Sequence, residues 1–192
     1  PTKVSHVFHD LNGKIDAILD GGDCAIGVES TVISFIGEIP KLLRPGGVTK
    51  EQIENVIGKI EVDDAVLNQV KEGQIVSSPG MKYKHYAPKA NVIMLKGNQE
   101  GYIRYVNSHK KTGVLALCYE DDKKFLNVPS ISYGKEGEYM SQANLFFDAL
   151  RKIDEMPEIN KVYARCPEPK GLGLAIYNRL IRAAGFEVLT VE

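Results

Sequence analysis

The 192-residue sequence contains no tryptophan, and it has almost no excess of charge of either sign. Its 24 lysines and arginines and 25 aspartates and glutamates give a net charge of −1. This balance excludes a polycation that holds nucleic acid by charge alone. No apolar run approaches the roughly 20 residues that cross a bilayer, so we expect no membrane-spanning segment. No charged and then apolar leader opens the sequence, so we expect a cytoplasmic protein.

Cysteine is also scarce. The number of cysteines is odd, and the three, Cys24, Cys118 and Cys166, are widely spaced. No Cys-x-x-Cys pair occurs. A disulfide framework or a zinc ribbon is therefore not indicated, and we expect reduced thiols. His6 and His9 form a His-x-x-His pattern, but a fraying surface turn explains it better than a metal site, and we predict none.

The composition is that of a folded α/β protein, with 43% hydrophobic and 26% charged residues. Residues 14–58 read as short strands and turns, with strands expected at 15–19, 31–36 and 40–44. The last two are close enough to pair as a hairpin. Thr49-x-x-Gln52 is a capping box that predicts a helix, and Gly58 is a suitable end for it.

From Asn91 onward, strand and helix patterns alternate, which predicts a mostly parallel sheet covered by helices. The expected strands are 92–95, 113–118, 130–133, 161–165 and 188–191. The expected helices are 102–108, 141–153 and 172–184. We therefore divide the chain into a small α/β lobe (1–60) that lacks part of its sheet, a connector (61–90), and an α/β domain (91–192) with its own core.

Two polar groups flank the predicted hairpin. Ser30 and Thr31 precede an apolar strand and could donate hydrogen bonds to a carboxylate or phosphate. A turn that satisfies its own backbone is the commoner reason for such residues. Arg44 ends the next apolar run, just before Pro45-Gly46-Gly47, and its planar fork suits a phosphate or carboxylate. A surface ion pair is the alternative.

The segment 79–90 is rich in cations and aromatic rings and has no acidic residue. It contains Met81, Lys82, Tyr83, Lys84, His85, Tyr86 and Lys89. Cations interleaved with aromatic rings can hold phosphate while a base stacks on the rings. A solvated linker is the alternative, although the density of aromatic residues favours a segment that docks on something.

The stretch Gly171-Leu-Gly-Leu-Ala175 half matches a dinucleotide-binding fingerprint. Ile176 occupies the position where the fingerprint requires Gly or Ala. We interpret the stretch as a closely packed helix start, and we expect Asn178 and Arg179 to be structural rather than catalytic.

Taken in order, these motifs resemble those of a known enzyme family. Gly27-Val-Glu-Ser-Thr-Val-Ile33, Leu43-Arg-Pro-Gly46 and Ser78-Pro-Gly-Met-Lys-Tyr-Lys-His-Tyr-Ala-Pro88 together look like the long, two-domain form of the YrdC-type threonylcarbamoyl-AMP synthases. Gly171–Leu180 resembles the C-terminal domain of that family. The resemblance implies the end of a YrdC-like α/β domain, a connector and a Rossmann-like C-terminal domain.

The resemblance also implies an activity. These enzymes are nucleotidyltransferases that combine L-threonine, bicarbonate and ATP into threonylcarbamoyl-AMP and pyrophosphate. Downstream proteins use the product to make N6-threonylcarbamoyladenosine in tRNA. Mg²⁺ is expected on the ATP phosphates.

The resemblance assigns roles to individual residues. It implies that Ser30 and Arg44 are catalytic. The implied threonine-binding residues are Ser30, Thr31 and Tyr86. The implied ATP-binding residues are Arg44, Met81, Lys82, Tyr83 and His85, with the segment from Met81 to Tyr86 folding over the nucleotide.

The family's first domain begins well upstream of the position that matches Pro1, so we expect these 192 residues alone to be inactive. Two other functions stay open. One is a weakly RNA-binding, translation-factor-like module, and the other is a non-catalytic regulatory or oligomerisation domain. Stabilisation by ATP and threonine would favour the enzyme.

Overall fold

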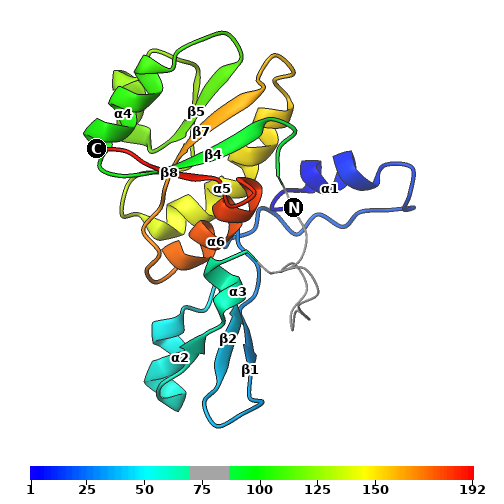
Figure 1. Ribbon diagram of the computed structural model, residues 1–192. Coiled ribbons are helices and arrows are strands. Elements are labelled where there is room, and N and C mark those ends of the chain that lie inside the picture. The colour runs from blue at the N-terminus through cyan, green and yellow to red at the C-terminus, as the bar shows by residue number, and fades with distance from the viewer. Residues whose placement is uncertain (70–86) are drawn as a thin grey trace.

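The structure is a computed structural model that describes residues 1–69 and 87–192. Figure 1 shows two lobes: a small one around the strands β1 and β2, and a larger one built on a parallel sheet. Within the described ranges, no helix is long and apolar enough to cross a membrane.

The small lobe is a three-stranded sheet with two short helices. Its elements are β1 (Val32–Ser34), β2 (Lys41–Arg44), α2 (Lys50–Ile57), β3 (Glu61–Val62) and α3 (Asp64–Leu67). β1 and β2 are antiparallel, which confirms the predicted hairpin, and β3 joins β2 in parallel. The capping box at Thr49 is formed, and Gly58 ends α2 with a φ of 84°. Because β3 pairs with β2, residues 61 and 62 belong to this sheet although the sequence suggested a connector.

Two predictions for the first 20 residues are wrong. Residues 4–11 form helix α1 (Val4–Leu11) rather than a fraying turn, because buried His6 anchors it against the larger lobe. Residues 15–19 are not a strand. No strand of the described chain pairs with them, and Leu19 is 98% exposed, so neither a ladder nor burial holds them extended.

The larger lobe confirms the predicted parallel sheet. Its elements are β4 (Asn91–Lys96), α4 (Gln99–Ser108), β5 (Val114–Cys118), the 3₁₀ helix η1 (Glu120–Phe125), β6 (Ser130–Ser132), α5 (Tyr139–Asp154), β7 (Lys161–Arg165), α6 (Gly173–Ala183) and β8 (Val188–Thr190). The strand order is β6-β5-β7-β4-β8, and every neighbouring pair is parallel.

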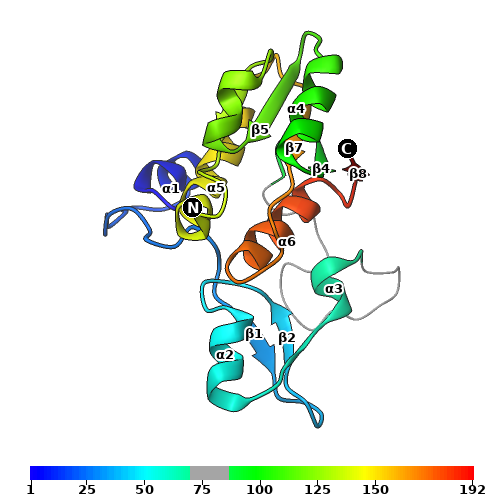
Figure 2. The ribbon, with the colours of Figure 1, turned by 90° about the vertical axis from the view of Figure 1, so that its left-hand side faces the viewer.

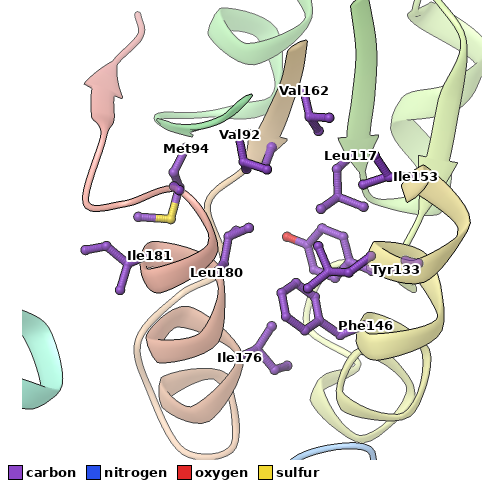
Figure 3. Packing of buried hydrophobic residues seen from close by; sticks show 14 of the residues in the cluster. Val92, Met94, Leu117, Tyr133, Phe146, Ile153, Val162, Ile176, Leu180 and Ile181 are labelled. Carbon is purple, nitrogen blue, oxygen red and sulfur yellow. The ribbon is translucent and has the colours of Figure 1, made fainter. Parts of the chain in front are cut away.

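Alternate residues of the central strands face two separate cores. Val92 and Met94 of β4 pack with α5 and α6, whereas Ile93 and Leu95 pack with α4 on the opposite face. Figure 3 shows the first core, where the side chain of Tyr133 lies among those of the sheet and the two helices. A sheet buried on both faces explains why these strands are continuous apolar runs in the sequence.

Helix α6 belongs to both lobes, as its position between them in Figure 2 shows. Its apolar side packs under the large sheet, while Leu174 joins the small core that includes Leu42 and Val66. Polar side chains of α6 form hydrogen bonds with the backbone of the small lobe. Asn178 Nδ2 donates to the carbonyl oxygen of Val66 at 2.5 Å, and Arg182 Nη2 donates to that of Ala65 at 2.6 Å.

Candidate functional site

Ser30 and Arg44, the two residues that the sequence placed at strand ends, lie in contact. The hairpin register sets Val32 opposite Arg44, so the residues just before β1 pass beside the arginine side chain. Arg44 Nε donates to the carbonyl oxygen of Ser30, and Nη2 donates to its hydroxyl, both at 3.0 Å. Ser30 is exposed and Arg44 is half-buried, so the pair is accessible from solvent.

The turn Pro45-Gly46-Gly47 closes on the backbone of the same segment. The amide of Gly47 donates to the carbonyl oxygen of Glu29 at 3.0 Å. A Cβ atom on Gly46 would lie only 2.1 Å from that oxygen and 2.5 Å from the carbonyl carbon of Ser30. A residue without a side chain is therefore required at position 46, because any Cβ would displace Ser30.

The hydroxyl of Thr31 forms a hydrogen bond within the chain. Its Oγ1 donates to the carbonyl oxygen of Val48 at 2.5 Å, which ties the start of β1 to the end of the glycine turn. The oxygen can still accept a hydrogen bond from a ligand, but its one proton is already engaged. Its role in threonine binding stays a prediction.

The rest of the predicted site lies outside the described residues. This applies to Met81, Lys82, Tyr83, His85 and Tyr86. The described chain resumes at Ala87, and the backbone amide of Lys89 donates to Asp154 Oδ1 at 2.8 Å, which fixes the end of the connector to α5.

Glu29, the residue next to Ser30, is tied to the larger lobe by a contact that sequence reasoning missed. The carboxylate of Glu29 lies 2.5 Å from Nε of Arg179 on α6, and their side chains are 30% and 9% exposed. From the sequence we expected a structural role for Arg179. The contact with Glu29 is consistent with that role, because it joins the two lobes at the candidate site. Both residues lie in motifs that the sequence singled out, so opposite charges in two motifs were the available signal.

A cavity of about 240 Å³ lies between the lobes beside Glu29. Its walls are mainly apolar and come from the segment before Ser30 and from α5. They include Thr2, Ile26, Val28, Phe146, Phe147 and Leu150, with Glu29 and Arg179 at the polar side.

A larger hollow of about 780 Å³ separates α1 from α5 and is lined by charged groups of both signs. Asp148 lies there, 3.3 Å from Lys3 and 3.0 Å from Lys152. Nε2 of His6 lies 3.2 Å from the same carboxylate. The hydrogen bond from Arg151 holds the pKa of Asp10 below its usual value. The contacts of Asp148 with Lys3 and His6, and that of Asp10 with Arg151, attach α1 to α5.

The described residues contain no cluster of three histidine, cysteine, aspartate or glutamate side chains that could hold a metal ion. Glu29, the carboxylate beside Ser30, is engaged by Arg179. The cysteines are unpaired, and burial raises the pKa of Cys118 to about 12 and that of Cys166 to about 11, so neither is a thiolate at neutral pH.

Comparison with known proteins identifies similar sequences along the whole chain. The sequence model described as the threonylcarbamoyl-AMP synthase C-terminal domain matches residues 48–185, and one described as telomere recombination matches residues 1–46. The threonylcarbamoyl-AMP synthase of Bacillus subtilis is 44% identical over 192 residues, which cover 98% of this chain and 54% of the relative. That of Pyrococcus abyssi is 40% identical over 197 residues, which cover 100% of this chain and 56% of the relative.

The fold is also that of a solved structure. A crystal structure of P. abyssi Sua5 complexed with L-threonine matches with a TM-score of 0.85 and 37% identity, covering 100% of this chain and 56% of that one. The chain therefore spans just over half the length of the relatives that it matches.

Proposed function

We propose, since the chain belongs to the threonylcarbamoyl-AMP synthase family, that it supplies part of the site that makes threonylcarbamoyl-AMP from L-threonine, bicarbonate and ATP. Pyrophosphate is the second product. The observation that carries the proposal is the contact between Ser30 and Arg44 at the mouth of the hairpin. The product would serve downstream proteins that form N6-threonylcarbamoyladenosine in tRNA, which fits a cytoplasmic location.

The reaction requires a site that binds two anions close together. In the key step an oxygen of the threonine carbamate attacks the α-phosphorus of ATP, and the bond to pyrophosphate breaks. The carbamate, the threonine carboxylate and the triphosphate all carry negative charge. Fixed positive charge and oriented donors at such a site lower the free energy of the transition state by countering charge that water would otherwise solvate.

The contact between Ser30 and Arg44 leaves hydrogen-bond donors available for both threonine and ATP. Because Ser30 Oγ accepts a hydrogen bond from Arg44, its own proton is available to a carboxylate, which suits threonine. Arg44 has five N–H groups, and its two hydrogen bonds to Ser30 use two of them. In the described part of the chain the other three donate to no acceptor, so they suit a phosphate.

We further propose that the segment from Met81 to Tyr86 closes over the bound nucleotide. Lys82, Tyr83 and His85 would contact ATP together with Met81, and Tyr86 would contact threonine beside Thr31. Closure excludes water that would hydrolyse the carbamate or the mixed anhydride. Mg²⁺ would be held mainly by the ATP phosphates and by water, since no carboxylate cluster of the described residues is placed to bind it.

The domain boundaries also stay a proposal: a small lobe at 1–60, a connector at 61–90 and a Rossmann-like domain at 91–192. The start of β4 at Asn91 supports the beginning of the last domain, whereas β3, which pairs with β2, extends the sheet of the small lobe to residue 62. The net charge of −1 gives no support to the alternative of an RNA-binding module.

A chimera tests the function. The residues of the B. subtilis relative that match this chain are replaced by this chain, and release of pyrophosphate from ATP is measured. We expect release that depends on both threonine and bicarbonate, and we expect its loss in the chimera with Arg44→Ala. A folded chimera without threonine-dependent release would refute the proposal. The 192-residue chain alone is expected to give no turnover, and robust turnover would overturn that expectation.

A further inference from the structure

We propose that Arg179 is a positioning residue for the Ser30–Arg44 pair and that it acts through Glu29. Helix α6 of the larger lobe would thus set the geometry of a site that lies on the small lobe. This inference rests on the proposed function, and it gives the C-terminal domain a part in the reaction.

The segment just before Ser30 lies against the larger lobe. A Cβ atom on Gly27 would lie 2.1 Å from the carbonyl oxygen of Ala143, so the backbone there passes directly over α5. Asn144 Nδ2 donates to the carbonyl oxygen of Cys24 at 2.7 Å, and Val28 packs against the large core. Glu29 then meets Arg179 at 2.5 Å.

The same segment is held from the other side by the small lobe. The carbonyl oxygen of Glu29 accepts from the amide of Gly47, and Ser30 accepts two hydrogen bonds from Arg44. Three links therefore run in series: Arg179 to Glu29, Glu29 to Ser30 through the backbone, and Ser30 to Arg44. A movement of α6 relative to the small lobe would be transmitted along them to the serine hydroxyl.

Packing alone does not fix the Glu29 side chain. The cavity of about 240 Å³ lies beside the segment, with Glu29 and Arg179 both in its wall, so that side is not filled by other atoms. The ion pair with Arg179 is a directional contact there, and its arginine side chain is only 9% exposed. It has a second effect, because an unpaired Glu29 carboxylate would repel the anionic substrates of the adjacent site.

Hydrogen exchange at the amide of Gly47 tests the positioning directly. This amide is bonded to Glu29, so it exchanges faster if Glu29 leaves its place. In the 192-residue chain, we expect Arg179→Ala to speed this exchange by about tenfold or more. Arg182→Ala is the matched control, since Arg182 lies on the same helix and bonds to the small lobe at Ala65 rather than at Glu29. Arg182→Ala should leave the exchange rate of the Gly47 amide unchanged, even if it lowers the midpoint of unfolding as much as Arg179→Ala does.

Kinetics of the chimera then test the consequence for the reaction. We expect Arg179→Ala to raise the KM for threonine by about tenfold with a smaller change in kcat, and Arg179→Lys to recover part of the loss. Arg182→Ala should keep the KM for threonine within about twofold. A general loss of stability would instead affect both arginine variants alike.

The outcomes separate this inference from the proposed function. Unchanged Gly47 exchange in Arg179→Ala overturns the inference, whether or not the chimera is active. Faster exchange with an unchanged KM for threonine overturns it as well. A chimera that lacks turnover before any substitution refutes the proposed function, and the exchange result still decides whether Arg179 holds Glu29.

Discussion

Arg44 holds Ser30 at two points, since its guanidinium donates both to the serine carbonyl oxygen and to the serine hydroxyl at 3.0 Å. The first hydrogen bond fixes the backbone and the second orients the side chain. The two residues are fourteen positions apart in the sequence and act as one unit in the structure. Their effects on substrate binding should therefore be coupled.

A double-mutant cycle in the chimera measures that coupling. We expect Ser30→Ala to raise the KM for threonine more than the KM for ATP, and Arg44→Ala to do the reverse. Either substitution removes the hydrogen bond between the Arg44 guanidinium and the Ser30 hydroxyl. The double variant should therefore lose less than the sum of the two single losses, with a coupling of about 0.5–3 kcal/mol in kcat/KM. Losses that add within about 0.5 kcal/mol would show that the contact is absent in the working enzyme. Equal losses for both substrates would indicate misfolding instead.

Gly46→Ala tests the closeness of the glycine turn to the site. The added Cβ would meet the backbone of Glu29, Ser30 and Thr31 at 2.1–2.5 Å, so the turn or the segment must move. We expect the free energy of unfolding to fall by about 1–3 kcal/mol, measured in urea, and the KM for threonine of the chimera to rise.

Gly21→Ala is the control for this substitution, because a Cβ there has no atom within 4 Å. It should change the free energy of unfolding by less than about 0.5 kcal/mol. Equal stability and equal kinetics of the two alanine variants would contradict the structure at the turn.

The parts of the fold that could be predicted from sequence depend on short-range patterns. The hairpin, the capping box at Thr49 and the alternation of elements after Asn91 each have a signal within one or two elements. The contact between Ser30 and Arg44 followed from the hairpin, because pairing two neighbouring strands brings their ends together.

The features that were predicted wrongly or missed depend on contacts between residues that are distant in the sequence. α1 is fixed by the contact of His6 with Asp148, which lies 142 positions away, and no local pattern encodes it. Residues 15–19 have the apolar character of a strand but no partner strand in the described chain. The Glu29–Arg179 pair was missed for the same reason, since only the packing of α6 between the lobes brings these charges together.

The carboxyl end of the large sheet holds a buried ion pair whose removal should be costly. Asp122 is fully buried and accepts hydrogen bonds from Arg165 at 2.6 Å, from Gln99 at 2.8 Å and from the amide of Tyr119 at 3.0 Å. Asp122→Ala leaves the guanidinium of Arg165 buried without this partner. We expect the free energy of unfolding in urea to fall by about 3–5 kcal/mol.

Glu136→Gln is the comparison for this variant. Glu136 also binds Arg165, at 2.9 Å, but its side chain is 60% exposed, so water replaces the contact when the charge is removed. The loss should stay below about 1 kcal/mol. A loss for Glu136→Gln as large as that for Asp122→Ala would refute the assignment of the stabilisation to the buried pair.

Acid should loosen the attachment of α1 to α5 through Asp148. Burial raises the pKa of this carboxyl, but the hydrogen bonds and charges of Lys152 and Lys3 outweigh it and hold the pKa below 3.8, its ordinary value. A lowered pKa in the folded state means that the stabilisation is complete above 3.8 and is lost as the pH falls through the folded value. The carboxylate also faces His6, whose Nε2 lies 3.2 Å from Oδ1 of Asp148.

Urea unfolding at pH values between about 5 and 2 measures this loss. Asp148→Asn should be less stable than the unsubstituted chain near pH 5, and the two should converge as the pH falls, because the variant has no carboxylate to protonate. Asp16→Asn, at an exposed position, should run parallel to the unsubstituted chain. Parallel curves for Asp148→Asn as well would show that the ion pairs of Asp148 do not stabilise the contact between α1 and α5.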